Sequence, residues 1–158
     1  TYSNAQFVVL GSGDWEYEQF FKEMQAKYPG RFVLCQGFVP ELARKIYGGS
    51  DIFLMPSKSE PCGLSQMVAL RYGSIPVVRE TGGLKDSITD SGDGKGNGFT
   101  FQTYDTQDML NSVHRAIYAY NESKDGWKVL VERAMACDNS WGRSANDYIR
   151  LYKQLINS

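Results

Sequence analysis

Residues 51–78 decide the fold, and they read DIFLMPSKSEPCGLSQMVALRYGSIPVV. The apolar run 51–55 ends at Pro56 and predicts a buried strand, and the run 75–78 predicts a second one. Between them, the segment 64–71 predicts a helix that ends at Gly73. Because parallel strands covered on both faces are continuous apolar runs, this order indicates two parallel strands joined by a helix.

The same alternation continues on both sides of this unit. Short apolar runs predict further strands at 6–10, 31–36 and 98–101. Glycine, proline and capping residues delimit helical segments, which we expect at 15–27, 41–47, 106–120, 124–136 and 141–156, and a short element of unassigned type is expected at 84–88. The predicted fold class is therefore α/β: a Rossmann-like, doubly wound parallel sheet with helices on both faces and a helical C-terminal tail. We expect residues 1–158 to form one domain of this kind.

The composition is that of a globular domain without a nucleic-acid or membrane partner. Of the 158 residues, 42% are hydrophobic and 22% charged, and the net charge of −1 offers no basic surface to a nucleic acid. No apolar run reaches the roughly 18 residues of a membrane span. The odd, widely spaced cysteines Cys35, Cys62 and Cys137 predict free thiols rather than disulfides or a zinc site. Because the chain starts at Thr1 without a signal sequence or initiator Met, we expect a fragment or a processed product.

Ligands of such sheets bind outside the carboxyl ends of the strands. Glycine-rich or polar segments follow four of the predicted strands and should converge there, namely 11–13, 37–38, 57–63 and 79–83. No basic block accompanies them, so an anion would be held by backbone amides and a few side chains. This convergence predicts a ligand that carries phosphate.

The segment 60–65 has the chemistry for such a ligand. The N–H groups of Gly63 and Leu64 begin a helix and can bind an anion with help from the helix dipole, and the Ser65 hydroxyl could add a donor. An ordinary capped helix would have the same pattern. The Glu60 carboxylate could accept hydrogen bonds from a sugar or stabilise positive charge at an anomeric carbon, or it could be a solvated loop residue.

Other glycine-rich segments give weaker signals. Gly82 and Gly83 either allow a ligand to approach the backbone or complete a turn. The segment 11–16 begins like a dinucleotide fingerprint, but Glu16 stands where the third glycine belongs. The segment 90–98 lacks the acidic ligand spacing of a calcium loop and predicts a flexible turn.

The single histidine and two tryptophans indicate structure rather than chemistry. His114 has no nucleophile to form a catalytic triad with, so we expect a packed or surface residue. Trp127 and Trp141 fall at helix starts and are expected to pack against the domain.

Three segments together resemble the ADP-glucose-dependent glycogen and starch synthases: 55–66 (MPSKSEPCGLSQ), 71–78 (RYGSIPVV) and 81–86 (TGGLKD). The ending 135–141 (MACDNSW), with Tyr148 and Tyr152 after it, is similar to the closing helix of that family. The resemblance covers essentially the whole chain and implies the C-terminal lobe of a two-lobed GT-B glycosyltransferase. The implied reaction transfers glucose from ADP-glucose to the non-reducing end of an α-1,4-glucan, with retention and without a metal or other cofactor.

The resemblance also implies roles for single residues. Glu60 would be the catalytic carboxylate and would line the glucose together with Cys62 and Gly63. Gly63, Leu64 and Ser65 would hold the diphosphate. The remaining contacts to the nucleotide sugar would come from Gly11, Gly13, Gly37, Phe38, Thr81, Gly82 and Gly83.

Three points decide how closely the chain follows the family pattern. Phe38 stands where the family often has a Tyr against the adenine, so stacking is kept and a hydroxyl is lost. Val68 stands where related retaining transferases carry a second Glu, which the synthase branch also lacks, so a two-carboxylate mechanism is disfavoured. The Arg and Lys that the family sets against the diphosphate, and the lobe that faces the acceptor, would lie before Thr1.

The expected partners are ADP-glucose or ADP and, through the other lobe, an α-1,4-glucan, in the bacterial cytoplasm or alternatively the plastid stroma. Two alternatives remain open. A non-catalytic nucleotide- or glucan-binding module would have the same glycine loops. A related glycosyltransferase that uses another sugar nucleotide or acceptor would differ at few positions.

Overall fold

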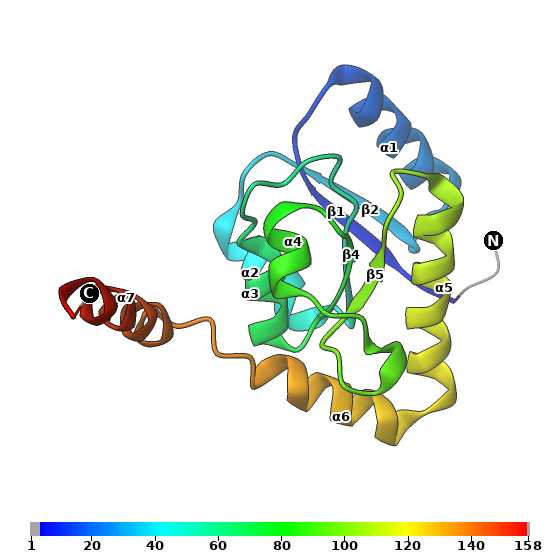
Figure 1. Ribbon diagram of the computed structural model, residues 1–158. Helices are drawn as coiled ribbons and strands as arrows, with labels where there is room; N and C mark the ends of the chain where they lie inside the picture. Colours follow the sequence, from blue (N-terminus) through cyan, green and yellow to red (C-terminus); the bar gives the residue numbers. More distant parts are fainter. Residues whose placement is uncertain (1–3, 158) are drawn as a thin grey trace. The chain divides into compact units, whose positions relative to one another are not determined.

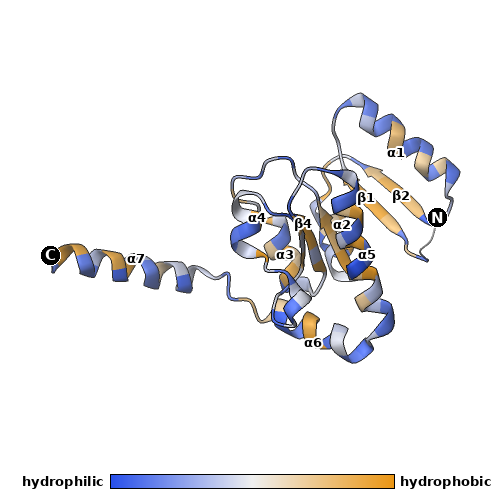
Figure 2. Cartoon of the chain, turned by 45° about the vertical axis from the view of Figure 1, so that its right-hand side comes forward, coloured by the Kyte–Doolittle hydropathy of each residue, from blue (hydrophilic) through white to orange (hydrophobic). Residues whose placement is uncertain are grey.

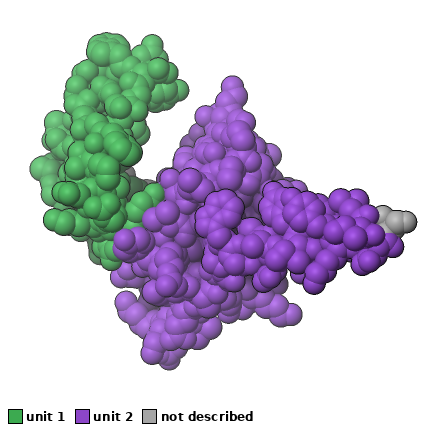
Figure 3. Space-filling model, turned by 90° about the vertical axis from the view of Figure 1, so that its left-hand side faces the viewer, with its two compact units in different colours: residues 1–50 green, residues 51–158 purple. Residues whose placement is uncertain are grey.

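A computed structural model describes residues 4–157. The chain divides into two compact units, Thr1–Ser50 and Asp51–Ser158, which Figure 3 shows in different colours.

The first unit is a β-α-β-α segment. It contains β1 (Phe7–Gly11), α1 (Trp15–Lys27), β2 (Phe32–Gln36) and α2 (Pro40–Gly49). The two strands are parallel, with Phe7 opposite Phe32 and Gly11 opposite Gln36. Stacked rings hold α1 against the pair, since the centroids of Phe21 and Phe32 lie 5.8 Å apart. The predicted strands and helices of this region are confirmed to within a few residues.

The second unit contains a three-stranded parallel sheet in the order β3-β4-β5, of which Figure 1 labels β4 and β5. Ile52 pairs with Ile75, and Val77 pairs with Phe99. Its elements are β3 (Ile52–Met55), α3 (Ser65–Tyr72), β4 (Ile75–Arg79), α4 (Gly82–Ser87), the 3-10 turn η1 (Ser91–Asp93), β5 (Phe99–Phe101), α5 (Thr106–Glu122), α6 (Lys124–Met135) and α7 (Trp141–Ile156). The α/β class with parallel strands is confirmed.

The core of the second unit surrounds β4. Ile75, Val77 and Val78 are completely buried, and Leu70 of α3 and Leu84 of α4 pack against them. The helices α3 and α4 lie on one side of β4 and α5 on the other, which explains why β4 is apolar on both faces (Figure 2). Two polar side chains, Gln66 and Ser74, are also completely buried in this unit.

Two expectations for this unit are wrong. Gly82 and Gly83 form the first turn of α4 rather than a turn before a helix. Trp141 does not pack, because 87% of it is exposed and α7 has no buried residue. Trp127 does pack on the core, edge to face with Tyr120 at 5.2 Å between centroids.

The glycine-rich segment 90–98 is a tied loop rather than a free turn. Asp90 accepts hydrogen bonds from the N–H groups of Gly92 and Thr100, both at 2.8 Å, and forms an ion pair with Arg115 at 2.5 Å. At the other end, Arg133 donates to the carbonyl of Gly96 at 2.7 Å. Apart from the bond to Gly92, these side-chain bonds connect residues 10 to 37 positions apart in sequence, so the local glycine content does not predict them.

Candidate functional site

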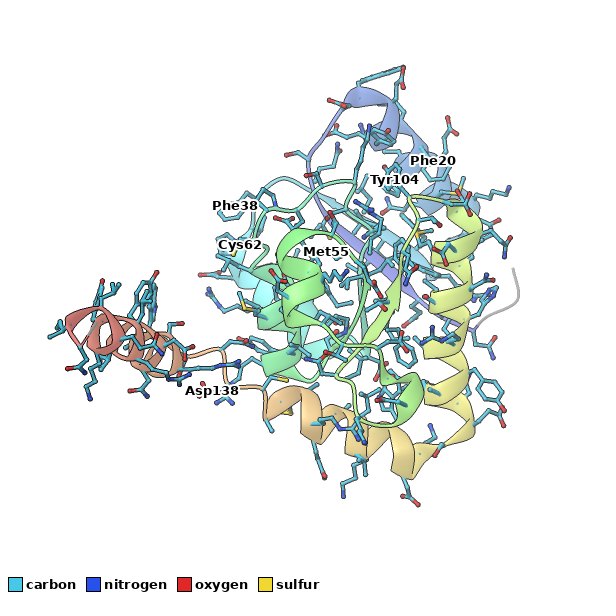
Figure 4. All side chains as sticks on the ribbon, viewed as in Figure 1. Phe20, Phe38, Met55, Cys62, Tyr104 and Asp138 are labelled. Atoms are coloured by element: carbon cyan, nitrogen blue, oxygen red, sulfur yellow. The ribbon has the colours of Figure 1, made fainter. Side chains whose placement is uncertain are left out.

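The loop 57–64 joins β3 to α3 at the carboxyl end of the second sheet, and Arg79 at the end of β4 anchors it. The guanidinium donates from Nε to the carbonyl of Ser57 at 2.9 Å and from Nη2 to the carbonyl of Lys58. It also donates to the carbonyl of Gln102 at 3.5 Å and lies 5.8 Å from the ring centroid of Tyr104, which Figure 4 labels. The side chain of Arg79 therefore stabilises the backbone of the loop 57–64 through hydrogen bonds.

The start of α4 packs directly on the same loop. The N–H of Gly83 donates to the carbonyl of Glu60 at 3.2 Å. A Cβ on Gly82 would lie 2.0 Å from the backbone carbonyl oxygen of Glu60, and a Cβ on Gly83 would lie 1.9 Å from the backbone carbonyl oxygen of Cys62. No side chain fits in these gaps, so both glycines are required for the loop and α4 to meet.

The start of α3 leaves its backbone donors free. Gly63 has a φ of +71°, which suits glycine, and it leads the chain into the helix. No side chain caps this helix. Within the part of the chain that the structure describes, no acceptor faces the N–H groups of Gly63, Leu64, Ser65 and Gln66. Uncapped N–H groups at a helix start form a binding site for an anion.

The side chains around these amides are open to a ligand. Glu60 is half-buried, and its carboxylate has no hydrogen bond or ion pair within residues 4–157. Cys62 and Leu64 are exposed, Leu64 by 68%. Ser65 and Thr81 are half-buried. The structure thus brings eight of the predicted site residues of the second unit to one edge: Glu60, Cys62, Gly63, Leu64, Ser65, Thr81, Gly82 and Gly83.

Of the four predicted site residues of the first unit, Gly11 and Gly37 contact each other directly. Gly11 ends β1, and its carbonyl accepts a hydrogen bond from the N–H of Gly37 at 3.1 Å. Gly13 donates its N–H to Glu18 Oε1 at 3.1 Å. Phe38 follows Gly37 and is 90% exposed. A Cβ on any of the three glycines would have nothing within 4 Å.

The described residues offer no clustered metal ligands. Among residues 4–157, no group of three or more His, Cys, Asp or Glu side chains could hold a metal ion. The three cysteines are free thiols, as predicted, and His114 lies on the surface. In the same described range, none of the helices combines the length and the apolar character that crossing a membrane requires.

Sequence reasoning gave no role to Gln66 or Arg79, although both hold the site together. Gln66 shares a helix face with Ala69 and Leu70, which are buried, and this 3.6-residue spacing could have marked it as a buried polar residue. The carbonyl partners of Arg79 had no comparable signal, because they lie 21–23 residues away in sequence.

Comparison with known proteins identifies the family of the chain. Residues 1–126 match the family model described as glycosyl transferases group 1. This chain belongs to that family. It is 54% identical to the glycogen synthase of Geobacillus thermodenitrificans and 50% identical to that of Pseudothermotoga lettingae, over 96% of the chain in each case.

A solved structure extends the likeness to three dimensions. The catalytic domain of starch synthase IV from Arabidopsis thaliana, bound to ADP and acarbose, matches 97% of this chain with a TM-score of 0.84 and 40% identity. The chain spans 31–32% of the two glycogen synthases and 33% of the starch synthase chain. The predicted family resemblance and fold class are therefore confirmed, whereas the roles of single residues stay predictions.

Proposed function

We propose that this chain is the donor-binding half of a glycogen or starch synthase and holds ADP-glucose while glucose passes to an α-1,4-glucan. The observation that carries this proposal is the row of free N–H groups at residues 63–66 beside the unpartnered carboxylate of Glu60. The relatives named above support the substrate class, since they are glycogen synthases and a starch synthase solved with ADP. The acceptor-binding lobe would come from outside this chain, and we propose the bacterial cytoplasm as the compartment.

The N–H groups at the start of α3 and the carboxylate of Glu60 would stabilise opposite charges that develop during glucose transfer. Transfer breaks the bond between C1 of glucose and the distal phosphate oxygen, forms a bond from C1 to a glucan hydroxyl oxygen, and passes the hydroxyl proton to the departing diphosphate. Negative charge grows on the departing diphosphate, which the N–H groups at the start of α3 would stabilise. Positive charge grows at C1, which the carboxylate of Glu60 would stabilise.

The test is transfer of labelled glucose from ADP-glucose to glycogen by the full-length protein that contains this chain. We expect Glu60→Ala to lower kcat by roughly 100-fold, because it removes a charge that acts mainly in the transition state. Glu122→Ala serves as a control, since Glu122 is an exposed carboxylate at the end of α5. Undiminished turnover in Glu60→Ala would rule out the role assigned to Glu60.

Binding measurements separate this proposal from its alternatives. Titration of the chain with ADP, UDP and maltooligosaccharide by calorimetry should show ADP as the preferred nucleotide. Glucan binding without nucleotide binding would instead favour a non-catalytic module, and a preference for UDP would favour a related transferase. We expect no turnover by the 158-residue chain alone, because donor and acceptor must be held together.

A further inference from the structure

Gln66 is a completely buried amide that the chemistry above does not use. Its Nε2 donates to the carbonyl of Gly63 at 2.9 Å, to the carbonyl of Cys62 at 3.3 Å and to Ser87 Oγ at 3.1 Å. Its Oε1 has no hydrogen-bond partner among the described residues. A Cβ on Gly63 would lie 2.6 Å from this oxygen, so Oε1 rests against the Cα of Gly63 and meets at most a weak C–H donor. The Oε1 atom of Gln66 is thus a buried acceptor without a partner among the described residues, while Nε2 donates to the backbone of the loop 57–64.

The two carbonyls that Gln66 holds determine where the neighbouring N–H groups point. The described peptide bonds are all trans, and a trans peptide places its C=O and N–H on opposite sides. When the carbonyls of Cys62 and Gly63 turn toward the buried amide, the N–H groups of Gly63 and Leu64 turn away from it. These two donors are among the free N–H groups at the start of α3.

Ser87 extends this link from α3 to α4. Its hydroxyl accepts from Gln66 and donates to the carbonyl of Gly83 at 2.6 Å. Gly83 in turn contacts the loop at Glu60 and Cys62. Asn97 fixes the far side, because its Nδ2 donates to the carbonyl of Ser87 at 3.0 Å. The contacts form a closed path through the loop, α3 and α4.

We propose that Gln66 and Ser87 are positioning residues that hold the N–H groups of Gly63 and Leu64 in the orientation that binds the diphosphate of the donor. This inference rests on the function proposed above. It assigns to Gln66 and Ser87 no contact with the substrate and no direct part in bond breaking. Without the link, the loop would have to be ordered by the ligand, and binding would weaken by the cost of that ordering.

The experiment compares the affinity of the full-length protein for ADP in four variants, at a temperature well below the midpoint of unfolding of each. Gln66→Met keeps the volume and removes both amide hydrogens, and we expect it to raise the Kd for ADP roughly tenfold. Ser87→Ala should raise it about threefold, and the double variant should resemble Gln66→Met, because the two residues form one link.

Ser112→Ala is the matched control. Ser112 is also buried, and its hydroxyl donates to the carbonyl of Thr100 at 2.7 Å, but it lies in α5 outside the link. We expect it to lower the midpoint of unfolding about as much as Ser87→Ala does and to leave the Kd for ADP unchanged.

The outcomes separate this inference from the proposed function. An unchanged Kd in Ser87→Ala and in the folded fraction of Gln66→Met, with a wild-type protein that binds ADP, would overturn the positioning role alone. The proposed function would then stand. A wild-type protein without affinity for ADP would overturn both. If Gln66→Met does not fold, Ser87→Ala against Ser112→Ala decides the question.

Discussion

Glycines of the two units were predicted to serve the same purpose, yet the structure treats them differently. In the second unit, Gly82 and Gly83 face backbone oxygens that a Cβ would approach to 2.0 and 1.9 Å. In the first unit, Gly11 and Gly13 face open space, and neither has a positive φ. The fold of the chain therefore requires Gly82 and Gly83. It does not require Gly11 and Gly13, so a need for glycine at these two positions would have to come from a ligand.

This difference separates two reasons for a glycine that a sequence cannot distinguish. Substitution of a glycine that lets two segments pack together lowers the free energy of unfolding. Substitution of a glycine that gives room to a ligand instead lowers the affinity for that ligand. Each prediction below tests one side of this comparison.

The largest effect is expected for Gly83→Ala. The new methyl group would collide with the carbonyl of Cys62, so either α4 or the loop must move. We expect a loss of about 3 kcal/mol in the free energy of unfolding, measured by urea denaturation of the chain. Gly13→Ala is the reference, since the same change there meets no atom within 4 Å. Equal stability of the two variants would show that the contact between the loop and α4 is not rigid.

A smaller effect is expected at Asp90, which holds the loop 90–98 through its negative charge rather than through close packing. Partial burial raises the pKa of Asp90, but the bonds from Arg115 and from the N–H groups of Thr100 and Gly92 outweigh it, so the pKa lies below its usual range. A lowered carboxyl pKa stabilises the fold above about pH 4, the value in an unfolded chain, and this stabilisation is lost as pH falls through the folded pKa.

We therefore expect Asp90→Asn to cost about 1 to 2 kcal/mol at pH 7 and to flatten the loss of stability below pH 4. Urea denaturation of both proteins at pH 7 and at steps below pH 5 measures this. Asp125→Asn is a control, because it changes an exposed carboxylate in the first turn of α6. An acid profile identical to that of the wild-type protein would show that Asp90 does not contribute through its charge.

Much of the fold could be predicted because the signals are local. The run 75–78 is buried on both faces, whereas the run 51–55, also expected to be buried, is only partly buried, with Leu54 39% exposed. The glycine and proline residues between the two runs mark where the helix begins and ends. The failures have physical reasons. Trp141 was expected to pack because tryptophan usually does, but no described element covers α7. Two adjacent glycines predict a turn by themselves, but Gly82 and Gly83 begin a helix that packs on the carbonyls of Glu60 and Cys62, about 20 residues earlier in the sequence.

The location of the candidate site could be predicted from the sequence, but the side chains that orient its backbone could not. The segment 60–65 indicated an anion site because a loop that ends in glycine and leads into a helix presents free N–H groups. The residues that orient those groups, Gln66, Ser87 and Arg79, act on backbone carbonyls through side-chain hydrogen bonds. Such bonds depend on tertiary contacts and have no spacing of their own in the sequence.

The smallest effect on stability and the sharpest test of the comparison is expected for Gly13→Ala. Because its Cβ would contact nothing within 4 Å, we expect the free energy of unfolding to stay within about 0.5 kcal/mol of the wild-type value. If a nucleotide approaches this backbone, the same methyl group should raise the Kd for ADP roughly tenfold in a calorimetric titration of the full-length protein. Gly49→Ala is the matched control, since Gly49 is another glycine of the first unit with open space and no positive φ. Equal ADP affinity in the two variants would show that neither the fold nor a bound nucleotide requires glycine at position 13. The proposed nucleotide contacts of the first unit would then rest on Gly37 and Phe38.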